Sequence, residues 1–385
     1  DFLTALPADQ LLDVLLHYVE PNAPLKVARF AGPTDQADLH AILTTAKGDW
    51  SVVIGVEPSG QRRINALFFE PIVVPAPAKP LKDWKDLVSR FKKIAPETSL
   101  TVAELTPRGC APIATLNPDQ ELAVGSSFKL YVAGELARQI AAGKLRWDQL
   151  VTIRDDLRSL PNGDLRLAAA GSQYTLRYVF EQMISQSDNT ATDHLIALLG
   201  RTNVEAMMAT MSHAKPALNT PLLLTREWFA IKLRWSSKQI AAYLTSQPAE
   251  KRVLLKQADA DADTLGQDEE WLNPYLIDSI EWFASSADLC RAMAYLHGQM
   301  AKPDLAELQS AFSISEGISF DAATWRYVGF KGGSETGVKS DVWLLERADG
   351  RWFVVSAIIN DTKQEIDGVA MHQLLAAAVG LLAQA

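Results

Sequence analysis

A serine and a lysine three residues apart limit the fold and chemistry of this chain more than any other feature. They lie in the hexapeptide Gly-Ser-Ser-Phe-Lys-Leu at residues 125–130, and a helical pattern of apolar residues covers residues 128–140. Helix positions i and i+3 lie on one face, one turn apart. The spacing therefore predicts that the amine of Lys129 lies within hydrogen-bond reach of the hydroxyl of Ser126. A serine becomes a nucleophile when a neighbouring base takes its proton, and a buried, uncharged lysine can be that base.

Two later motifs favour a catalytic interpretation of this pair. Ser-x-x-Lys alone also fits an N-cap serine with a solvated lysine. Ser-Asp-Asn stands at residues 187–189, and Lys-Gly-Gly at residues 331–333 follows an apolar, strand-like run. Ser-x-x-Lys, Ser-Asp-Asn and Lys-Thr-Gly in this order are typical of penicillin-recognising serine hydrolases. Over residues 98–385 the sequence resembles that family, and class A β-lactamases most closely.

The resemblance implies an α+β fold, a β-lactamase/transpeptidase-like sandwich of an antiparallel sheet and a helical half. The apolar patterns agree with this expectation. Two strands of a hairpin are predicted before the serine helix, three strands near the end of the chain, and a final helix over the sheet: residues 100–105, 111–116, 325–330, 338–345, 352–359 and 369–382.

The resemblance also implies catalytic roles. Ser126 would be the nucleophile, with its backbone N–H directed at a developing oxyanion by the start of the helix. Lys129 would be the base or part of the proton relay. Ser187 would pass a proton to the leaving nitrogen with help from Lys331, and Lys331 would also attract a substrate carboxylate.

The substrate would be held by residues of the second and third motifs. Asn189 would bind the acyl-amide side chain of a substrate, Gly333 would let the substrate approach the backbone, and the N–H of Ser334 would complete the oxyanion hole. Gly332 replaces the usual threonine and removes a hydroxyl that helps to hold the substrate carboxylate. Ser334 or Thr336 could compensate for this loss.

The residue that activates the deacylating water is the second departure from the family. Class A enzymes carry it in a Glu-x-x-Leu-Asn stretch after Ser-Asp-Asn, and this chain has none there. Glu227 and Glu281 are possible replacements. Glu227 also suits the first turn of a helix, where the dipole favours a carboxylate. Glu281, beside Trp282 and Phe283, could be buried with a raised pKa and act as a base.

Residues 1–75 lie outside the lactamase pattern and are predicted to form a small α+β accessory domain. An amphipathic helix at residues 9–16, a short helix at residues 39–43, and a hairpin of residues 50–56 and 63–69 are expected. The domain resembles the nuclear-transport-factor (NTF2) or steroid-isomerase type, with a packing or substrate-shaping role. Residues 76–97 are predicted to be a linker and a helix, and residues 98–385 the hydrolase domain.

This domain order resembles that of the two-domain serine hydrolase of the clavulanic acid biosynthetic cluster. The resemblance implies esterase activity on cephalosporin-type substrates and weak lactamase activity. The family assignment as a whole favours a hydrolase that acts on β-lactams or related acyl esters. The alternatives are a D-alanyl-D-alanine carboxypeptidase, an esterase with little lactamase activity, and a penicillin-sensing module that stays acylated.

The composition of the chain limits the classes of partner and cofactor that we expect it to bind. The net charge of −9 over 385 residues argues against nucleic acid, whose binding needs a basic surface. The sequence has no apolar run of 18 residues, the histidines show no metal-ligand spacing, and we expect neither metal nor organic cofactor. Cys110 and Cys290 could pair in an oxidising compartment, but the sequence does not decide this. We expect a trimmed N-terminus and a periplasmic or secreted protein; the oligomeric state stays open.

Overall fold

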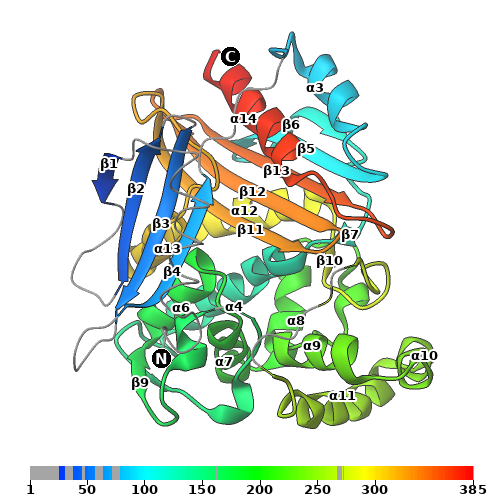
Figure 1. Cartoon of the computed structure of the whole chain (residues 1–385). Helices are drawn as coiled ribbons and strands as arrows, with labels where there is room; N and C mark the ends of the chain where they lie inside the picture. The colour runs from blue at the N-terminus through cyan, green and yellow to red at the C-terminus, as the bar shows by residue number, and fades with distance from the viewer. Residues whose placement is uncertain are drawn as a thin grey trace, which may run out of the picture. The chain divides into compact units, whose positions relative to one another are not determined.

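The computed structural model of the chain divides into two compact units (Figure 1). One comprises residues 1–80 with 317–319, and the other comprises residues 81–316 with 320–385. The structure describes residues 79–161, 163–266, 271 and 273–384, together with the backbone of four strands between residues 26 and 71. Each unit is described by itself below.

The described part of the first unit is a four-stranded antiparallel sheet in the order β1-β2-β3-β4. The predicted hairpin is present, since β3 pairs with β4 antiparallel. The short helix predicted at residues 39–43 is wrong, because these residues lie in β2, where pairing with β3 outweighs a short apolar run. The helix predicted at residues 9–16 lies outside the described residues. The strands are β1 (Lys26–Phe30), β2 (Asp38–Thr45), β3 (Gly48–Val56) and β4 (Ile64–Pro71).

The second unit is built on a five-stranded antiparallel sheet in the order β11-β12-β13-β5-β6. All five predicted strands are confirmed, and each is longer than the sequence pattern indicated. The sheet joins an N-terminal hairpin to three strands from the end of the chain, because β5 pairs with β13. The strands are β5 (Glu97–Thr106), β6 (Gly109–Leu116), β11 (Trp325–Glu335), β12 (Val338–Arg347) and β13 (Trp352–Asn360).

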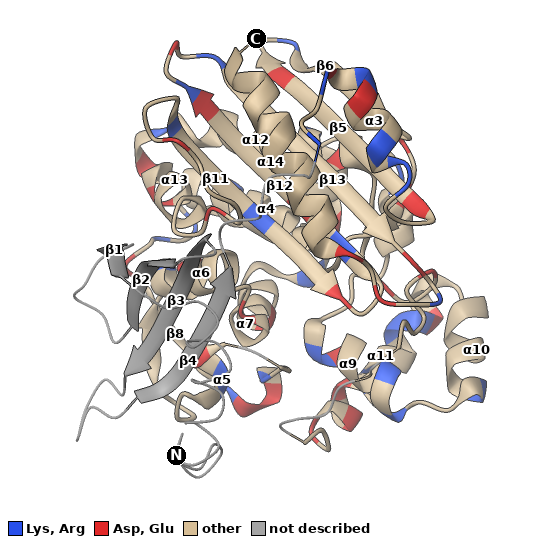
Figure 2. Cartoon of the chain, turned by 45° about the horizontal axis from the view of Figure 1, so that its top comes forward, with Lys and Arg blue, Asp and Glu red and all other residues tan. Residues whose placement is uncertain are grey.

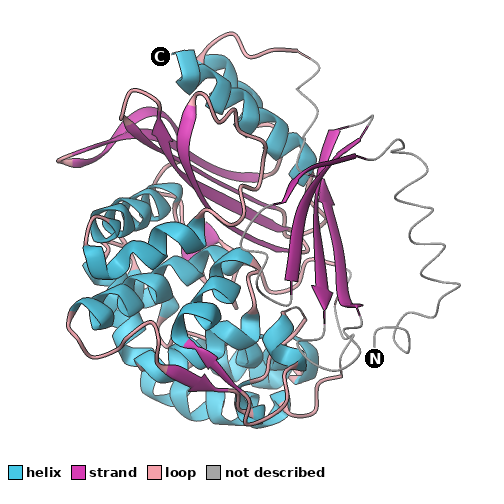
Figure 3. Cartoon of the chain, turned by 90° about the vertical axis from the view of Figure 1, so that its left-hand side faces the viewer, coloured by secondary structure: helices cyan, strands magenta, loops and turns pink. Residues whose placement is uncertain are grey.

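Helices cover both faces of this sheet, as the side view in Figure 3 shows. The C-terminal helix α14 (Gly368–Gln384) and α3 (Trp84–Phe91) pack together over one face, and α12 (Ser286–Met300) lies against the other. Strands β12 and β13 are therefore buried on both sides along most of their length, which explains why β13 and the middle of β12, at residues 342–345, are apolar. This is the expected sandwich with an antiparallel sheet.

The helical half surrounds α4, whose residues are nearly all buried. Gly134 lets α4 approach its neighbour closely, since a Cβ atom there would lie 2.4 Å from Sδ of Met211. The remaining helices of this half are α5 (Asp164–Leu167), α6 (Leu176–Ser185), α7 (Asn189–Leu199), α8 (Arg201–Thr210), α9 (Thr225–Arg234), α10 (Ser237–Thr245), α11 (Pro248–Ala262) and α13 (Ala306–Phe312), and α4 itself spans Lys129–Ala141.

A disulfide joins Cys110 of β6 to Cys290 of α12, with the sulfur atoms 2.01 Å apart. The bond ties the edge of the sheet to the helix beneath it and answers the question that the sequence left open. Acidic and basic residues are interspersed over α3, α9 and α11 (Figure 2). Within the described part of the chain, none of the helices has the length and apolar character needed to cross a bilayer.

Candidate active site

Ser126 lies in a short 3-10 helix, η2 (Gly125–Phe128), that leads directly into α4. Gly125 has a φ of +46°, a left-handed conformation that suits glycine. Ser127 is buried, and its hydroxyl bonds that of Ser340 on β12 at 2.7 Å. Ser126, by contrast, is only half-buried, and no described residue bonds its Oγ atom. The start of the serine helix is thus fixed by its neighbours, while the hydroxyl of Ser126 is unengaged.

Lys129 is fully buried and binds the Ser-Asp-Asn motif. Its Nζ atom lies 2.5 Å from the carbonyl oxygen of Ser187, 3.2 Å from Oγ of Ser187 and 2.7 Å from Oδ1 of Asn189. These bonds take up the three N–H groups of an ammonium, so the described structure has no hydrogen bond from Lys129 to Ser126. Burial lowers the pKa of Lys129 to about 7, although Asp188 and Asp193 oppose the shift. A substantial neutral fraction is therefore expected near pH 7.

Ser187 connects the two lysines of the motifs. Its Oγ atom accepts a hydrogen bond from Lys129 and a second, at 3.0 Å, from Nζ of Lys331 on β11. Ser187 has a φ of +56°, which is uncommon for a residue with a side chain and typical of functional sites. Burial, and next the charge of Lys129, hold the pKa of Lys331 well below its usual range. The first, second and third motifs thus meet at one hydroxyl.

The middle of the second motif holds the loop in place. Asp188 is fully buried and caps α7, accepting from the backbone N–H of Ala191 and of Leu165 at 2.8 and 3.1 Å. Burial raises the pKa of Asp188 to about 6. Asn189 donates from Nδ2 to the carbonyl oxygen of Leu160. Both side chains therefore fix the loop that presents Ser187.

Strand β11 runs against the start of the serine helix. A Cβ atom on Gly333 would lie 2.2 Å from the carbonyl oxygen of Val124 and 2.6 Å from the backbone nitrogen of Ser126. A Cβ atom on Gly125 would lie 3.0 Å from the backbone nitrogen of Ser334. The backbone nitrogens of Ser126 and Ser334 consequently border the same small region, and Gly333 is needed for the close contact between strand and helix.

The glycine that replaces threonine in the third motif also has a packing reason. A Cβ atom on Gly332 would lie 2.7 Å from Oδ1 of the buried Asp341 on β12. Ser334 is exposed, whereas Thr336 donates its hydroxyl to the carbonyl oxygen of Trp271 at 3.2 Å. Of the two residues proposed to compensate for the missing hydroxyl, Ser334 is therefore the better placed.

Glu227 is a buried residue in the first turn of α9. Its Oε1 atom binds Arg201 at 2.7 Å, and its Oε2 atom accepts from the backbone N–H of Leu224 at 2.9 Å. Burial raises the pKa of Glu227 to about 7. Both oxygens are thus engaged in holding the start of α9.

Glu281 is also buried, which the sequence had left as one possibility. Its Oε1 atom accepts from the indole N–H of Trp228 at 2.8 Å and from Nζ of Lys232 at 2.6 Å. Lys232 in turn binds Glu335, the last residue of β11. Sequence reasoning missed Glu335 and Lys232. The signal available for Glu335 was its position, two residues beyond Gly333 and therefore on the same face of the strand.

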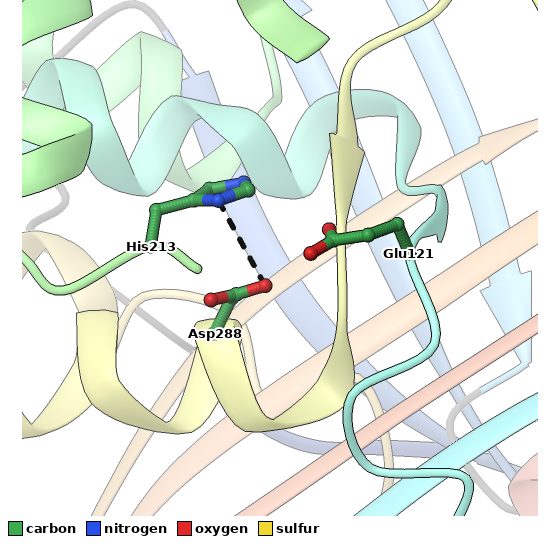
Figure 4. A group of neighbouring side chains, drawn as sticks. All are labelled: Glu121, His213 and Asp288. Atoms are coloured by element: carbon green, nitrogen blue, oxygen red, sulfur yellow. Dashed lines mark ion pairs between the residues drawn. The ribbon is translucent and has the colours of Figure 1, made fainter. Parts of the chain in front are cut away.

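A second polar group consists of Glu121, His213 and Asp288, and one side-chain oxygen or nitrogen atom from each lies within 4.8 Å of the other two (Figure 4). Nε2 of His213 must donate to the carbonyl oxygen of Phe283, so Nδ1 accepts from the backbone N–H of Lys215. Both ring nitrogens are thus used by the protein. Asp288 accepts hydrogen bonds from Ser285, Ala214 and Arg291.

Glu121 differs from its two neighbours, because no described residue donates to either of its buried carboxyl oxygens. Burial, and next the charge of Asp288, raise the pKa of Glu121 to about 7. Glu121 therefore keeps its proton to a higher pH than an exposed glutamate does.

A cavity of about 610 Å³ lies beside the disulfide, and its lining includes Cys110, Cys290, Arg108 and Arg291. None of the three motifs contributes to this lining. The candidate active site is therefore located by the convergence of its side chains and not by this cavity.

The fold and this convergence define a protein of the β-lactamase/transpeptidase class. The profile of the "Beta-lactamase enzyme family" matches residues 82–381. The chain belongs to this beta-lactamase family. No curated protein matches the sequence significantly.

Solved structures agree on the fold. A β-lactamase from Sphaerobacter thermophilus is 19% identical, with a TM-score of 0.52, and the match covers 77% of this chain and 96% of that one. A protein described as PBP-A is 17% identical, with a TM-score of 0.52 and coverage of 80% and 98%. A β-lactamase from Chitinophaga pinensis is 16% identical, with a TM-score of 0.51 and coverage of 78% and 97%. At these identities the likeness concerns the fold alone.

Proposed function

We propose that the chain is a serine hydrolase in which β-lactams or related acyl esters acylate Ser126. The observation that carries the proposal is the shared hydroxyl of Ser187, which accepts from both Lys129 and Lys331, near a Ser126 hydroxyl that is unengaged. Two buried lysines on one serine serve no packing purpose, because burying their charges is unfavourable. They suit proton transfer, in which one of them is neutral.

Acylation follows from this arrangement. A neutral Lys129 has two N–H groups and a free lone pair, which can then accept the proton of Ser126. A bond forms between Oγ of Ser126 and the carbonyl carbon, the carbon–nitrogen or carbon–oxygen bond of the substrate breaks, and the leaving atom takes a proton through Ser187. Backbone N–H groups of Ser126 and Ser334, with the dipole of α4, stabilise the oxyanion.

Lys331 supports substrate binding in this proposal. Its ammonium, when charged, attracts the carboxylate that penicillins, cephalosporins and peptide C-termini carry. Asn189 is proposed to hydrogen-bond the acyl-amide group of the substrate. The expected partner is thus a small acyl compound with a carboxylate.

A second candidate function is supported by a separate observation. Both carboxyl oxygens of Glu227 are held by other groups, and Glu281 is held at Oε1 while its Oε2 atom is buried. Neither glutamate therefore presents an accessible oxygen to a deacylating water. Slow deacylation would make the protein a penicillin-binding carboxypeptidase or a penicillin-sensing module rather than a β-lactamase. An esterase with little lactamase activity fits the same site if esters deacylate faster than lactams.

Intact-protein mass spectrometry after mixing with a penicillin, a cephalosporin and a simple ester tests these proposals. We expect an adduct on the wild type that Ser126→Ala lacks. Ser127→Ala is the matched control, because Ser127 is adjacent but bonds Ser340, and it should still form the adduct. A transient adduct with hydrolysed product would support a β-lactamase, and a persistent one would support the second candidate. An adduct that survives Ser126→Ala would refute the nucleophile.

We also propose that the protein works in the periplasm or outside the cell. The disulfide between Cys110 and Cys290 supports this, since such bonds persist in oxidising compartments. Residues 1–75 are proposed to be an accessory domain joined through the linker and helix at residues 76–97. Non-reducing mass spectrometry of the native protein tests the disulfide directly.

A further inference from the structure

A buried group of three charged side chains lies at the end of β11. Nζ of Lys232 is 2.6 Å from Oε1 of Glu281 and 2.8 and 2.9 Å from the two carboxyl oxygens of Glu335. The side chains of Lys232 and Glu281 are 0% exposed and that of Glu335 is 6% exposed. Lys232 also lies over the indole rings of Trp228 and Trp271, at 4.3 and 5.0 Å from their centroids. We call Lys232, Glu281 and Glu335 the triad.

The charges of the triad do not balance without an additional proton. Two carboxylates face one ammonium, and an uncompensated buried carboxylate is strongly disfavoured. Burial, and next the charge of Glu281, raise the pKa of Glu335 to about 10, and Lys232 opposes this shift. Oε2 of Glu281 is buried and has no hydrogen-bond partner among the described residues. A proton on Glu335 that is donated to Glu281 neutralises the group and satisfies this oxygen.

The triad connects three segments, two of which contact the short helix η2 that carries Ser126. Lys232 belongs to α9, and Glu281 precedes Trp282, whose ring stacks on Phe128 of η2 at 4.2 Å. Glu335 ends β11, whose Gly333 contacts the backbone of Ser126. Ser334, with the backbone N–H assigned to the oxyanion hole, lies between Gly333 and Glu335. Release of Glu335 would therefore remove the side-chain contacts that hold this end of β11, beside this N–H group, and leave only its pairing with β12.

We propose that Glu335 is a positioning residue for acylation, which shares a proton with Glu281 beside Lys232 and thereby holds the Ser334 N–H in place. The inference rests on the proposed function for the reaction that it serves. It assigns Glu281 to the support of the oxyanion hole and not to the activation of water.

Two substitutions test the role of Glu335 in acylation. Glu335→Ala removes the link but leaves Lys232 and Glu281 paired, so the protein should fold. We expect its acylation rate constant to fall about tenfold, less than the loss of a whole oxyanion donor. Glu335→Gln keeps the shape and an N–H donor and should stay within about threefold of the wild type, by the same reasoning. Glu205→Ala is the control, since Glu205 binds Arg252 and the backbone of Leu222 and should affect melting temperature only.

Unfolding measured against pH tests the shared proton independently of the reaction. The folded pKa of Glu335 is raised, so its proton stabilises the folded state most below the unfolded value near 4.5. This stability is lost as the pH rises towards about 10, and Glu335→Gln should not show the loss. Parallel stability curves for the wild type and Glu335→Gln would refute the shared proton, even if Glu335→Ala did not fold.

The rate measurements separate the two proposals. Glu335→Ala acylating at the wild-type rate, or Glu335→Gln as slow as Glu335→Ala, would refute the positioning role. A wild-type protein that forms no adduct would refute the proposed function instead, and the positioning role with it. The stability curves would then still decide whether the proton is shared.

Discussion

Gly333→Ala is the substitution for which the structure gives the most direct expectation. The added Cβ atom would lie 2.2 Å from the carbonyl oxygen of Val124 and 2.6 and 2.7 Å from the backbone nitrogens of Ser126 and Ser127. All three neighbours are backbone atoms, so no side chain can rotate away. Strand β11 and helix η2 must therefore separate.

The size of the separation sets the expected effects. The strand must move by roughly 0.8 Å before the shortest contact reaches 3.0 Å. Overpacking of this kind costs about 1–3 kcal/mol of unfolding free energy. A displacement of about 1 Å between a nucleophile and its oxyanion donors lowers the rate roughly 100-fold. We therefore expect a folded protein with a moderately lower melting temperature and an acylation rate constant reduced about 100-fold.

The assay is the rate of adduct formation with a penicillin, followed by mass spectrometry, alongside thermal unfolding. Gly298→Ala is the matched control, because a Cβ atom there meets nothing within 4 Å and Gly298 lies within α12. It should stabilise the protein by about 0.5–1 kcal/mol and leave acylation unchanged. Wild-type acylation by Gly333→Ala would show that the contact between β11 and η2 does not position the reacting groups.

Three further predictions use other parts of the structure. The acylation rate should rise as the pH passes about 7, because the proposed base is neutral Lys129, and Lys129→Met should lower the rate about 10²–10⁴-fold in stopped-flow assays. Cys110→Ser should lower the unfolding free energy by about 2–5 kcal/mol in chemical denaturation, because it removes the bond to Cys290, and an unchanged midpoint would contradict the disulfide. Glu121 has a raised folded pKa, so the wild type should lose stability between about pH 4.5 and 7 in thermal scans. Glu121→Gln should remove this loss, and an equal loss in this variant would refute the assignment to Glu121.

Much of the second unit could be predicted from the sequence because its strands are buried on both faces. Strands of this kind appear as apolar runs with turn residues between them, as at residues 342–345 and 352–359. The three motifs were also expected to lie near one another, because the resemblance to penicillin-recognising serine hydrolases implies a common site. Their contacts through Ser187 agree with the predicted proximity, while the catalytic roles stay predictions.

Other features depend on contacts between distant residues and could not be predicted. Leu39 to Leu43 form a strand because β3 pairs with them, and a short apolar run does not reveal its partner. The contact of Lys232 with Glu281 and Glu335 joins three segments that nothing in the local sequence relates. The same holds for Cys110 and Cys290, which are 180 residues apart.

The strand order β11-β12-β13-β5-β6 has a consequence for the synthesis of the chain. Glu97 at the start of β5 pairs with Asn360 at the end of β13, so the whole helical half is translated between two halves of one sheet. A nascent chain that ends before residue 325 contains the serine helix. It lacks β13, which pairs with β5, and β11, which lies beside η2. The sheet closes only when the last part of the chain has left the ribosome, and such long-range pairing is slow. Formation of an acyl adduct would therefore report complete assembly of this unit. In a truncated chain, the unpaired edge of β5 would need protection from pairing with other chains.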